Sequence, residues 1–121
     1  MDPMALGRKG EEEAVRYLED RGWKILGRNV RQDRKEVDVI AFRDGVLAFI
    51  EVKCRTSRRF GHPVEAITWR KRREIAWVAR AWLRARTLPS GTLVRFDAIS
   101  VLCPAGEAPQ ILHLPDAWRM D

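Results

Sequence analysis

The stretch Glu36-Val-Asp-Val-Ile-Ala-Phe-Arg-Asp-Gly-Val-Leu-Ala-Phe-Ile-Glu-Val-Lys53 decides the fold of this chain. At its centre, Asp44-Gly45 separates two apolar-rich runs, and this is the strongest short-range signal for a two-residue β-hairpin. A turn of that length fixes the register of the two strands. The pairs that follow by counting back from the turn are Arg43 with Val46, Ile40 with Phe49, Asp38 with Glu51, and Glu36 with Lys53.

This register places charged side chains together on one face of the hairpin, because side chains alternate along a strand. Asp38 and Glu51 are expected to face each other with Cβ atoms about 5 Å apart. At an effective dielectric constant of about 20, two carboxylates at that separation repel by roughly 3 kcal/mol. A divalent cation, a protonated carboxyl group or Lys53 between the acids would offset this repulsion. Because carboxylate oxygens are hard ligands, the pair predicts a site for Mg²⁺ or Mn²⁺.

Length and composition indicate one ordinary domain over residues 1–121. The chain has 45% hydrophobic residues, which excludes a disordered protein. It lacks an apolar run long enough for a membrane span, and its beginning lacks the apolar centre of a signal peptide. We therefore expect a cytoplasmic protein with no membrane partner. Two cysteines, Cys54 and Cys103, are too few for a disulfide framework.

The net charge of +6 is concentrated in one block. Residues 52–91 contain 11 Lys/Arg and 2 Asp/Glu, whereas residues 1–51 contain 10 and 11. A basic block directly after an acidic hairpin is typical of a protein that binds a polyanion next to a metal site. The residues predicted to contact DNA are Arg55, Arg58, Arg59, Arg70, Lys71, Arg73 and Trp77.

The remaining periodicities complete an α/β pattern. They predict a helix over residues 6–21, a strand over 23–30, hairpin strands over 36–43 and 46–54, a helical stretch to about residue 85 with a break near Thr68, a strand over 93–102 and a short strand over 111–114. The fold class is a central mixed β-sheet flanked by α-helices. Apolar positions Ala14, Val15 and Leu18 are expected to pack the first helix on the sheet.

Two charged residues share the apolar face of a predicted helix. Glu11 lies one turn before Ala14 and Val15, so it either stabilises the first turn as an acid or reaches the sheet. Lys71 lies one turn before Ile75, so it either extends out to solvent or reaches the carboxylates. Trp77 lies in an arginine stripe, which is either a solvated helix face or a phosphate-binding surface with a base or sugar on the indole.

An ordered set of motifs over most of the chain resembles the YraN family of small bacterial proteins. The motifs are Gly7-x-x-Gly10-Glu11-x-x-Ala14, Tyr17-Leu18, Gly22, Asn29, Glu36-Val37-Asp38-Val39-Ile40-Ala41, Glu51-Val52-Lys53-x-Arg55, Phe60-Gly61-x-Pro63-x-Glu65-Ala66 and Lys71. That family is similar to archaeal Holliday junction resolvases and, by resemblance, to the PD-(D/E)xK nuclease superfamily. The resemblance implies a restriction-endonuclease-like fold. The chain departs from the usual pattern at Lys35, Val37 and Cys54.

The resemblance also implies roles for individual residues. Asp38 and Glu51 are implied to be metal ligands, Glu11 to be the helix-borne acid of the resolvases, and Lys53 to position or polarise the attacking water. The metal hypothesis adds the Val52 carbonyl and Glu11 as further ligands. The catalytic set is therefore Lys53, Glu11, Asp38 and Glu51. We expect an Mg²⁺- or Mn²⁺-dependent endonuclease that acts on DNA phosphodiester bonds, with branched or damaged DNA as candidate forms.

The sequence leaves three alternatives to this function open. The charged hairpin is also compatible with a solvated surface on which Lys53 pairs with Glu36. A DNA-binding or recombination-accessory module could have the same fold with weak or absent turnover. A protein-interaction domain with an incidental basic surface is the third alternative, and assembly as a monomer or a homodimer is open.

Overall fold

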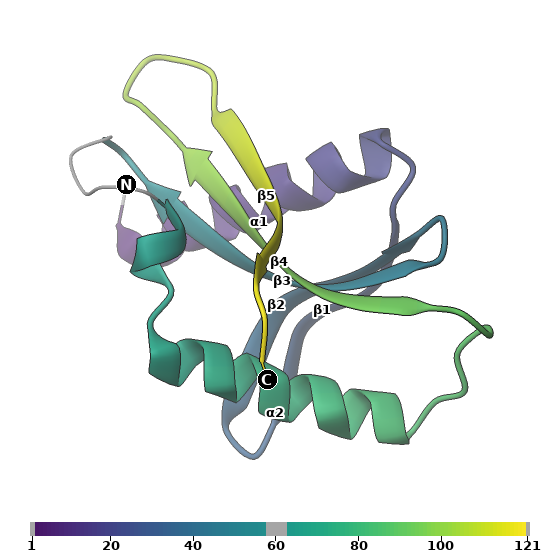
Figure 1. The fold of residues 1–121 in the computed structure, drawn as a ribbon. Helices are drawn as coiled ribbons and strands as arrows, with labels where there is room; N and C mark the ends of the chain where they lie inside the picture. The colour runs from purple at the N-terminus through teal and green to yellow at the C-terminus, as the bar shows by residue number, and fades with distance from the viewer. Residues whose placement is uncertain (1, 58–62, 121) are drawn as a thin grey trace.

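The structure is a computed structural model that describes residues 2–57 and 63–120. In these residues, five strands form one mixed sheet in the order β1-β2-β3-β4-β5, and two α-helices lie on its opposite faces (Figure 1). This confirms the predicted α/β class, and the arrangement is compatible with a restriction-endonuclease-like fold. The elements are α1 (Pro3–Asp20), β1 (Lys24–Gln32), β2 (Lys35–Arg43), β3 (Val46–Arg55), the 3-10 helix η1 (Pro63–Ala66), α2 (Trp69–Arg84), β4 (Leu93–Leu102) and β5 (Gln110–Trp118).

The β2–β3 hairpin has the predicted two-residue turn. Asp44 and Gly45 both have positive φ, 49° and 78°, which is the backbone geometry of a type I′ turn. Arg43 pairs with Val46, so the register near the turn is confirmed. The ladder continues only as far as Val39 and Ile50.

The predicted opposition of Asp38 with Glu51, and of Glu36 with Lys53, is therefore not part of the ladder. Val37 packs among the buried apolar residues on the α2 face of the sheet, whereas Val39 packs among those on the α1 face. Residues two apart on a regular strand share a face, so β2 turns about its axis at Asp38. This turn separates β2 from β3 at the end of the hairpin that holds the acidic residues.

The parallel pair β3 and β4 forms the middle of the sheet. It runs from Val46 beside Leu93 to Arg55 beside Leu102. Parallel neighbours require a crossover connection, and the segment that contains η1 and α2 supplies it. Because helices cover both faces, the middle of β3 is buried throughout residues 47–52.

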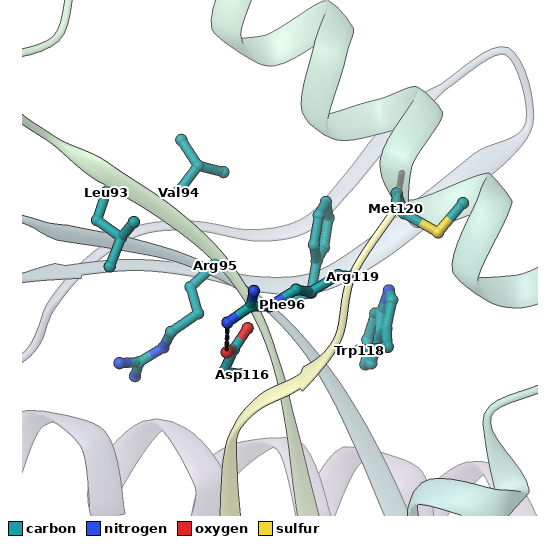
Figure 2. Close-up of a pocket in the computed structure, with 8 residues that line it drawn as sticks. All are labelled: Leu93, Val94, Arg95, Phe96, Asp116, Trp118, Arg119 and Met120. Carbon is teal, nitrogen blue, oxygen red and sulfur yellow. Dashed lines mark hydrogen bonds and ion pairs between the residues drawn. The ribbon is translucent and has the colours of Figure 1, made fainter.

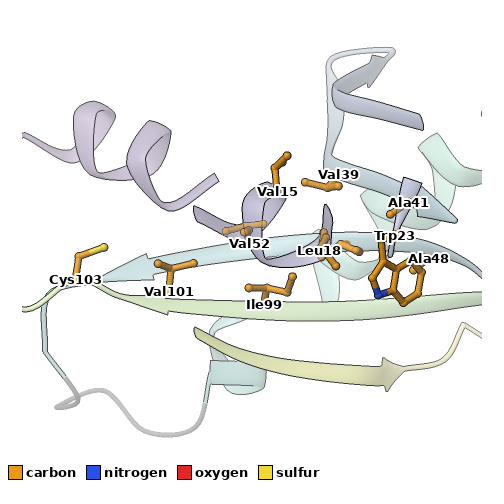
Figure 3. Packing of buried hydrophobic residues seen from close by; sticks show 12 residues of the cluster. Val15, Leu18, Trp23, Val39, Ala41, Ala48, Val52, Ile99, Val101 and Cys103 are labelled. Carbon is orange, nitrogen blue, oxygen red and sulfur yellow. The ribbon is translucent and has the colours of Figure 1, made fainter. Parts of the chain in front are cut away.

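Helix α1 packs on one face of the sheet through the three residues that the pattern predicted. Ala14, Val15 and Leu18 are buried against apolar residues of the strands. Figure 3 shows Val15 and Leu18 in this packing. Gly10 is also buried in this contact, and a Cβ atom there would collide with Cys54 Sγ. Glycine at this position therefore lets the helix approach the end of β3 closely.

Helix α2 covers the other face and begins where the predicted break occurs. Thr68 caps its start, with Oγ1 accepting a hydrogen bond from the Lys71 backbone N–H at 3.1 Å. Ile75, Val78 and Trp82 are buried on its inner face. Neither of the two described helices has the length and apolarity that crossing a membrane requires.

Strand β5 is longer than the predicted strand over 111–114. It continues through Pro115 and Asp116 to Trp118, and Asp116 has a positive φ of 51°. A proline is tolerated because β5 lies at the edge of the sheet. The buried carboxylate of Asp97 accepts a hydrogen bond from the Asp116 backbone N–H at 2.9 Å, which holds this irregular segment against β4.

Candidate functional site

The acidic residues predicted as a site meet where β2 and β3 separate. Asp38 comes from β2, Glu51 and Lys53 come from β3, and Glu11 comes from α1. The charge of Asp38 acts on the carboxyl groups of both Glu11 and Glu51. Lys71 enters from α2, so both helices and the hairpin contribute to one cluster.

Asp38 is fixed by the backbone of the neighbouring strand. Its Oδ2 accepts a hydrogen bond from the Val52 N–H at 2.7 Å. The side chain thus satisfies a donor just beyond the last β2–β3 pair, Val39 with Ile50. Asp38 and Val52 also line a hollow of about 230 Å³ beside α1, together with Glu11.

Glu51 is the buried acid of the cluster, with 2% of its surface exposed. Its Oε1 is buried and, among the residues described, has no hydrogen-bond partner, while Lys53 Nζ lies 3.5 Å from Oε2. Burial, followed by a hydrogen bond to Asp38 and the Asp38 charge, raises the pKa of Glu51 to about 8. Lys71 and Lys53 act in the opposite direction. Without a bound cation, a proton therefore offsets the repulsion between the two acids at neutral pH.

The ion pair of Lys53 differs from the one expected if the hairpin were a solvated charged surface. That alternative pairs Lys53 with Glu36, whereas Lys53 lies beside Glu51 and Glu36 forms an ion pair with Arg31 at 3.2 Å. Lys53 is partly exposed, with 39% of its side-chain surface accessible. Its ammonium group is therefore beside the buried acid and accessible to a ligand from solvent.

Asn29 links two further acids to this cluster. With its amide group oriented toward them, Nδ2 donates hydrogen bonds of 2.7 Å to Glu11 Oε1 and to Glu36 Oε1. Burial and the charges of Asp38 and Glu36 raise the pKa of Glu11, and Arg28 and Asn29 oppose that effect. Glu11 therefore reaches the sheet. Asn29 was not predicted as a site residue, although it belongs to the family motifs and has a positive φ of 49°.

Lys71 reaches the site and does not extend away from it. Its Nζ donates a hydrogen bond to the Glu36 carbonyl oxygen at 3.2 Å, and its charge lowers the pKa of Glu51. A helix residue is thus attached to β2 two residues before Asp38. This contact joins the basic helix to the acidic site.

The donor set suits a hard divalent cation. Glu51 Oε1 is an acceptor with no donor among the described residues, and Asp38 provides a second carboxylate. Residues 2–57 and 63–120 contain no group of three or more His, Cys, Asp or Glu side chains arranged to hold a metal by themselves. A cation here would use Asp38, Glu51, the Val52 carbonyl and water, and Mg²⁺ commonly retains several waters in protein sites.

The residues predicted to contact DNA fall into separate regions. Arg58 and Arg59 lie outside the described residues. Arg55 is at the end of β3, where it lines a hollow with Ser100 and Leu102. Arg70, Arg73 and Trp77 lie on the outer side of α2 and line a groove of about 350 Å³ with Lys35, Trp69 and Glu74.

Another hollow lies away from the carboxylates, between the start of β4 and the end of β5 (Figure 2). It has a volume of about 360 Å³, and the stacked rings of Phe96 and Trp118 are among its lining residues. Arg119 donates a hydrogen bond to Asp116 at 2.9 Å, and this pair is visible in Figure 2. Since the predicted site residues are absent from its lining, this hollow is separate from the candidate site.

Comparison with known sequences identifies the family. The sequence model of the family described as "Uncharacterised protein family UPF0102" matches residues 10–101. The chain is 42% identical to a UPF0102 protein of Rhodococcus opacus over 115 residues, which cover 95% of this chain and 97% of the relative. It is 44% identical to one of Trichlorobacter lovleyi over 117 residues, 96% of this chain and 91% of that relative. The chain therefore belongs to the UPF0102 family, in agreement with the motifs of its sequence.

Proposed function

We propose that this protein is a metal-dependent endonuclease of the PD-(D/E)xK type that hydrolyses DNA phosphodiester bonds. The observation that supports this most strongly is the pair of Asp38 and Glu51 on separating strands. Lys53 lies beside Glu51, whose buried Oε1 has no hydrogen-bond partner within residues 2–57 and 63–120. Lys53 of β3 and Lys71 of α2 add positive charge beside this pair, which suits a polyanionic substrate.

Asp38, Glu51 and the Val52 carbonyl would hold Mg²⁺ or Mn²⁺, and Glu11, which lines the same hollow as Asp38 and Val52, would contribute through water. The bound cation would polarise a phosphate oxygen and make water a better nucleophile. Asp38 is preorganised for this role because its Oδ2 is fixed on the Val52 N–H. Glu51 would lose its proton when the site is loaded, because a carboxylate ligand must be ionised.

Lys53 would stabilise the charge that develops on the phosphate in the transition state. Its ammonium group is partly exposed and 3.5 Å from Glu51 Oε2, so a phosphate placed at the acids is within its reach. Lys71 supports the site differently, because it ties α2 to the Glu36 carbonyl and adds positive charge near Glu51. Asn29 would keep Glu11 and Glu36 at fixed separation.

A cleavage assay with four DNA forms tests this function. Labelled single-stranded, duplex, flap and four-way substrates are incubated with the protein in Mg²⁺, in Mn²⁺ and in chelator. Cleavage of at least one form in the presence of either cation, lost in Asp38→Asn and retained in Asp20→Asn, is the expected result. Asp20 is a suitable control because it is an exposed aspartate at the other end of α1. No cleavage of any form in either cation would falsify the endonuclease proposal.

One observation favours a second function, a DNA-binding or recombination-accessory module. The pKa of Glu51 near 8 means that a proton alone can offset the repulsion between the acids, so the fold does not require a cation. Such a module would bind DNA equally well in chelator and would not cleave it. Its affinity would still depend on salt, and Arg73→Ala would reduce the slope of log K against log salt by about 1. An affinity independent of salt would indicate a protein-interaction domain.

A further inference from the structure

The groove on the outer side of α2 contains the most exposed aromatic surface of the described chain. Trp69 is 64% exposed and Trp77 is 46% exposed, whereas the other three tryptophans are at most 8% exposed. Trp69, Arg73 and Trp77 are spaced four residues apart, so they lie along one face of the helix. Large exposed indoles are costly in water and mark interaction sites when they gather in one groove.

One indole of the groove is hydrogen-bonded, and three cationic side chains lie in the same lining. Trp77 Nε1 donates a hydrogen bond to Asp33 Oδ2 at 3.1 Å, and Lys35 Nζ lies 5.2 Å from the centre of its ring. Arg70 and Arg73 lie in the same lining. Glu74 is the one acidic residue among the six lining residues, and it pairs with Arg70 at 3.5 Å. The lining therefore has an excess of cations and favours an anionic ligand.

Neighbouring residues of β2 and α2 link this groove to the carboxylate site. Lys35 of the groove precedes Glu36, and Arg70 of the groove precedes Lys71. The Lys71 Nζ to Glu36 carbonyl contact joins those two neighbours at 3.2 Å. Lys35 and Arg70 of the groove are therefore each one residue along the chain from a contact that belongs to the carboxylate site.

We propose that this groove binds an unpaired stretch of DNA, with bases stacked on Trp69 and Trp77 and phosphates on Lys35 and Arg73. This inference rests on the proposed function and narrows its substrate to DNA with a single-stranded segment beside the cleaved bond. Bases of an intact duplex are stacked on one another, so their faces are closed to an indole, whereas unpaired bases present them. The alternation of indole and cation along the groove matches the alternation of base and phosphate along a strand.

Binding measured without a divalent cation tests the groove separately from cleavage. Fluorescence anisotropy in chelator compares a labelled single-stranded oligodeoxynucleotide with a blunt duplex of the same sequence. We expect the single strand to bind more tightly to the wild type. Trp69→Ala should weaken that binding about 5- to 150-fold, the range for removing one base-stacking partner, and Trp69→Phe should restore most of it. The change in duplex affinity should be less than about twofold.

Leu93→Ala is the matched control. Leu93 is also a large exposed hydrophobic residue, 59% exposed, but it begins β4, after the end of α2. It should bind both DNA forms as the wild type does. Unchanged single-strand affinity in Trp69→Ala would overturn the groove assignment, and tighter binding of an RNA strand of the same sequence would overturn its assignment to DNA. If the wild type cleaves DNA but Trp69→Ala binds normally, the groove inference fails alone. If the Trp69 effect is found but no substrate is cleaved, the endonuclease proposal fails alone.

Discussion

Asp38 Oδ2 accepts the Val52 N–H at 2.7 Å, one step beyond the last backbone pair of the β2–β3 hairpin. In a fully paired hairpin, a backbone carbonyl would satisfy that donor. A side-chain carboxylate does so here, and the strands diverge with Asp38 held at their junction. The same residue therefore braces the sheet and presents a carboxylate beside Glu51.

This double role predicts different effects for two substitutions at Asp38. Asp38→Asn keeps an acceptor for the Val52 N–H, so its thermal unfolding should be close to that of the wild type. Asp38→Ala leaves that donor without its partner and should destabilise the fold by about 1–3 kcal/mol. Both should lose cleavage by at least roughly 100-fold, the scale for removing one preorganised group. Calorimetry should show weaker Mn²⁺ binding in both variants, and equal Mn²⁺ affinity in wild type and Asp38→Asn would contradict the metal assignment.

Lys53 provides the test that separates an enzyme from a binding module. Lys53→Ala should keep DNA affinity close to the wild-type value but lose cleavage by about 2.7–4 kcal/mol of barrier, because the ammonium group acts on charge that grows in the transition state. Lys53→Arg should recover little activity, since a broad guanidinium does not replace a compact ammonium group. Single-turnover cleavage and anisotropy measured on the same protein give both values. A Lys53→Ala protein that cleaves as fast as the wild type would exclude this role.

The raised pKa of Glu51 predicts how stability depends on pH in the metal-free protein. The unfolded carboxyl titrates near its ordinary value of 4.5, and the folded one near 8. The contribution of the protonated form to stability is complete below about pH 4.5 and is lost as pH rises toward 8. Glu51→Gln is neutral at every pH, so its stability relative to the wild type should increase over this window, on the order of 1.4 kcal/mol for each pKa unit of separation.

Urea unfolding of both proteins at pH 5, 7 and 9 in chelator measures this difference. Addition of Mn²⁺ at pH 9 should stabilise the wild type and leave Glu51→Gln nearly unchanged, because ligand binding to the folded state stabilises it. A constant difference between the two proteins from pH 5 to pH 9 would show that Glu51 titrates normally.

The hairpin was predictable because its turn is encoded locally. Two residues with positive φ, Asp44 and Gly45, fix the register through Ile40 and Phe49. The change of face at Asp38 was not predictable. Simple alternation of side chains along a strand assumes regular backbone pairing, and here a side chain takes the place of a backbone acceptor. The length of β5 was missed for a similar reason, because its continuation past Pro115 depends on a tertiary contact to Asp97.

The residue types of the candidate site were predictable, but only part of its geometry was. Asp38, Glu51 and Lys53 were found from the hairpin, and the structure brings them together. The position of Lys71 could not be decided from the helix pattern, because both solvent and the Glu36 carbonyl lie within reach of a long side chain. The exposure of Trp69 was not predicted from the sequence; its face of α2 is turned away from the sheet. Its four-residue spacing from Arg73 was the available signal.

The lowered pKa of Asp97 predicts a second pH dependence of stability, in the acidic range. Its buried carboxylate accepts hydrogen bonds from Arg95 Nε and Nη2 at 2.8 and 2.9 Å, from the Asp116 N–H, and lies 2.8 Å from His113 Nε2. Burial acts to raise the pKa of Asp97, but hydrogen bonds from His113, Arg95 and Asp116 outweigh it, so the pKa lies below its ordinary value of 3.8. This network contributes stability that is complete above about pH 4 and is lost as pH falls through the lowered pKa.

Asp97→Asn should therefore cost about 3–5 kcal/mol near neutral pH, because it leaves the Arg95 guanidinium without its anion in a mostly buried position. The difference from the wild type should shrink as pH falls below about 4, because the unfolded carboxyl becomes protonated first and the folded carboxylate follows at its lowered pKa. Tyr17→Phe is the matched control, since it removes only the hydroxyl that lies 3.3 Å from His113 Nδ1 and should cost less than about 1.5 kcal/mol at every pH. Urea unfolding at pH 7 and at successive pH values below 4 measures both variants. A difference between Asp97→Asn and the wild type that stays constant between these pH values would mean that the ionised Asp97 is not what holds β5 to β4.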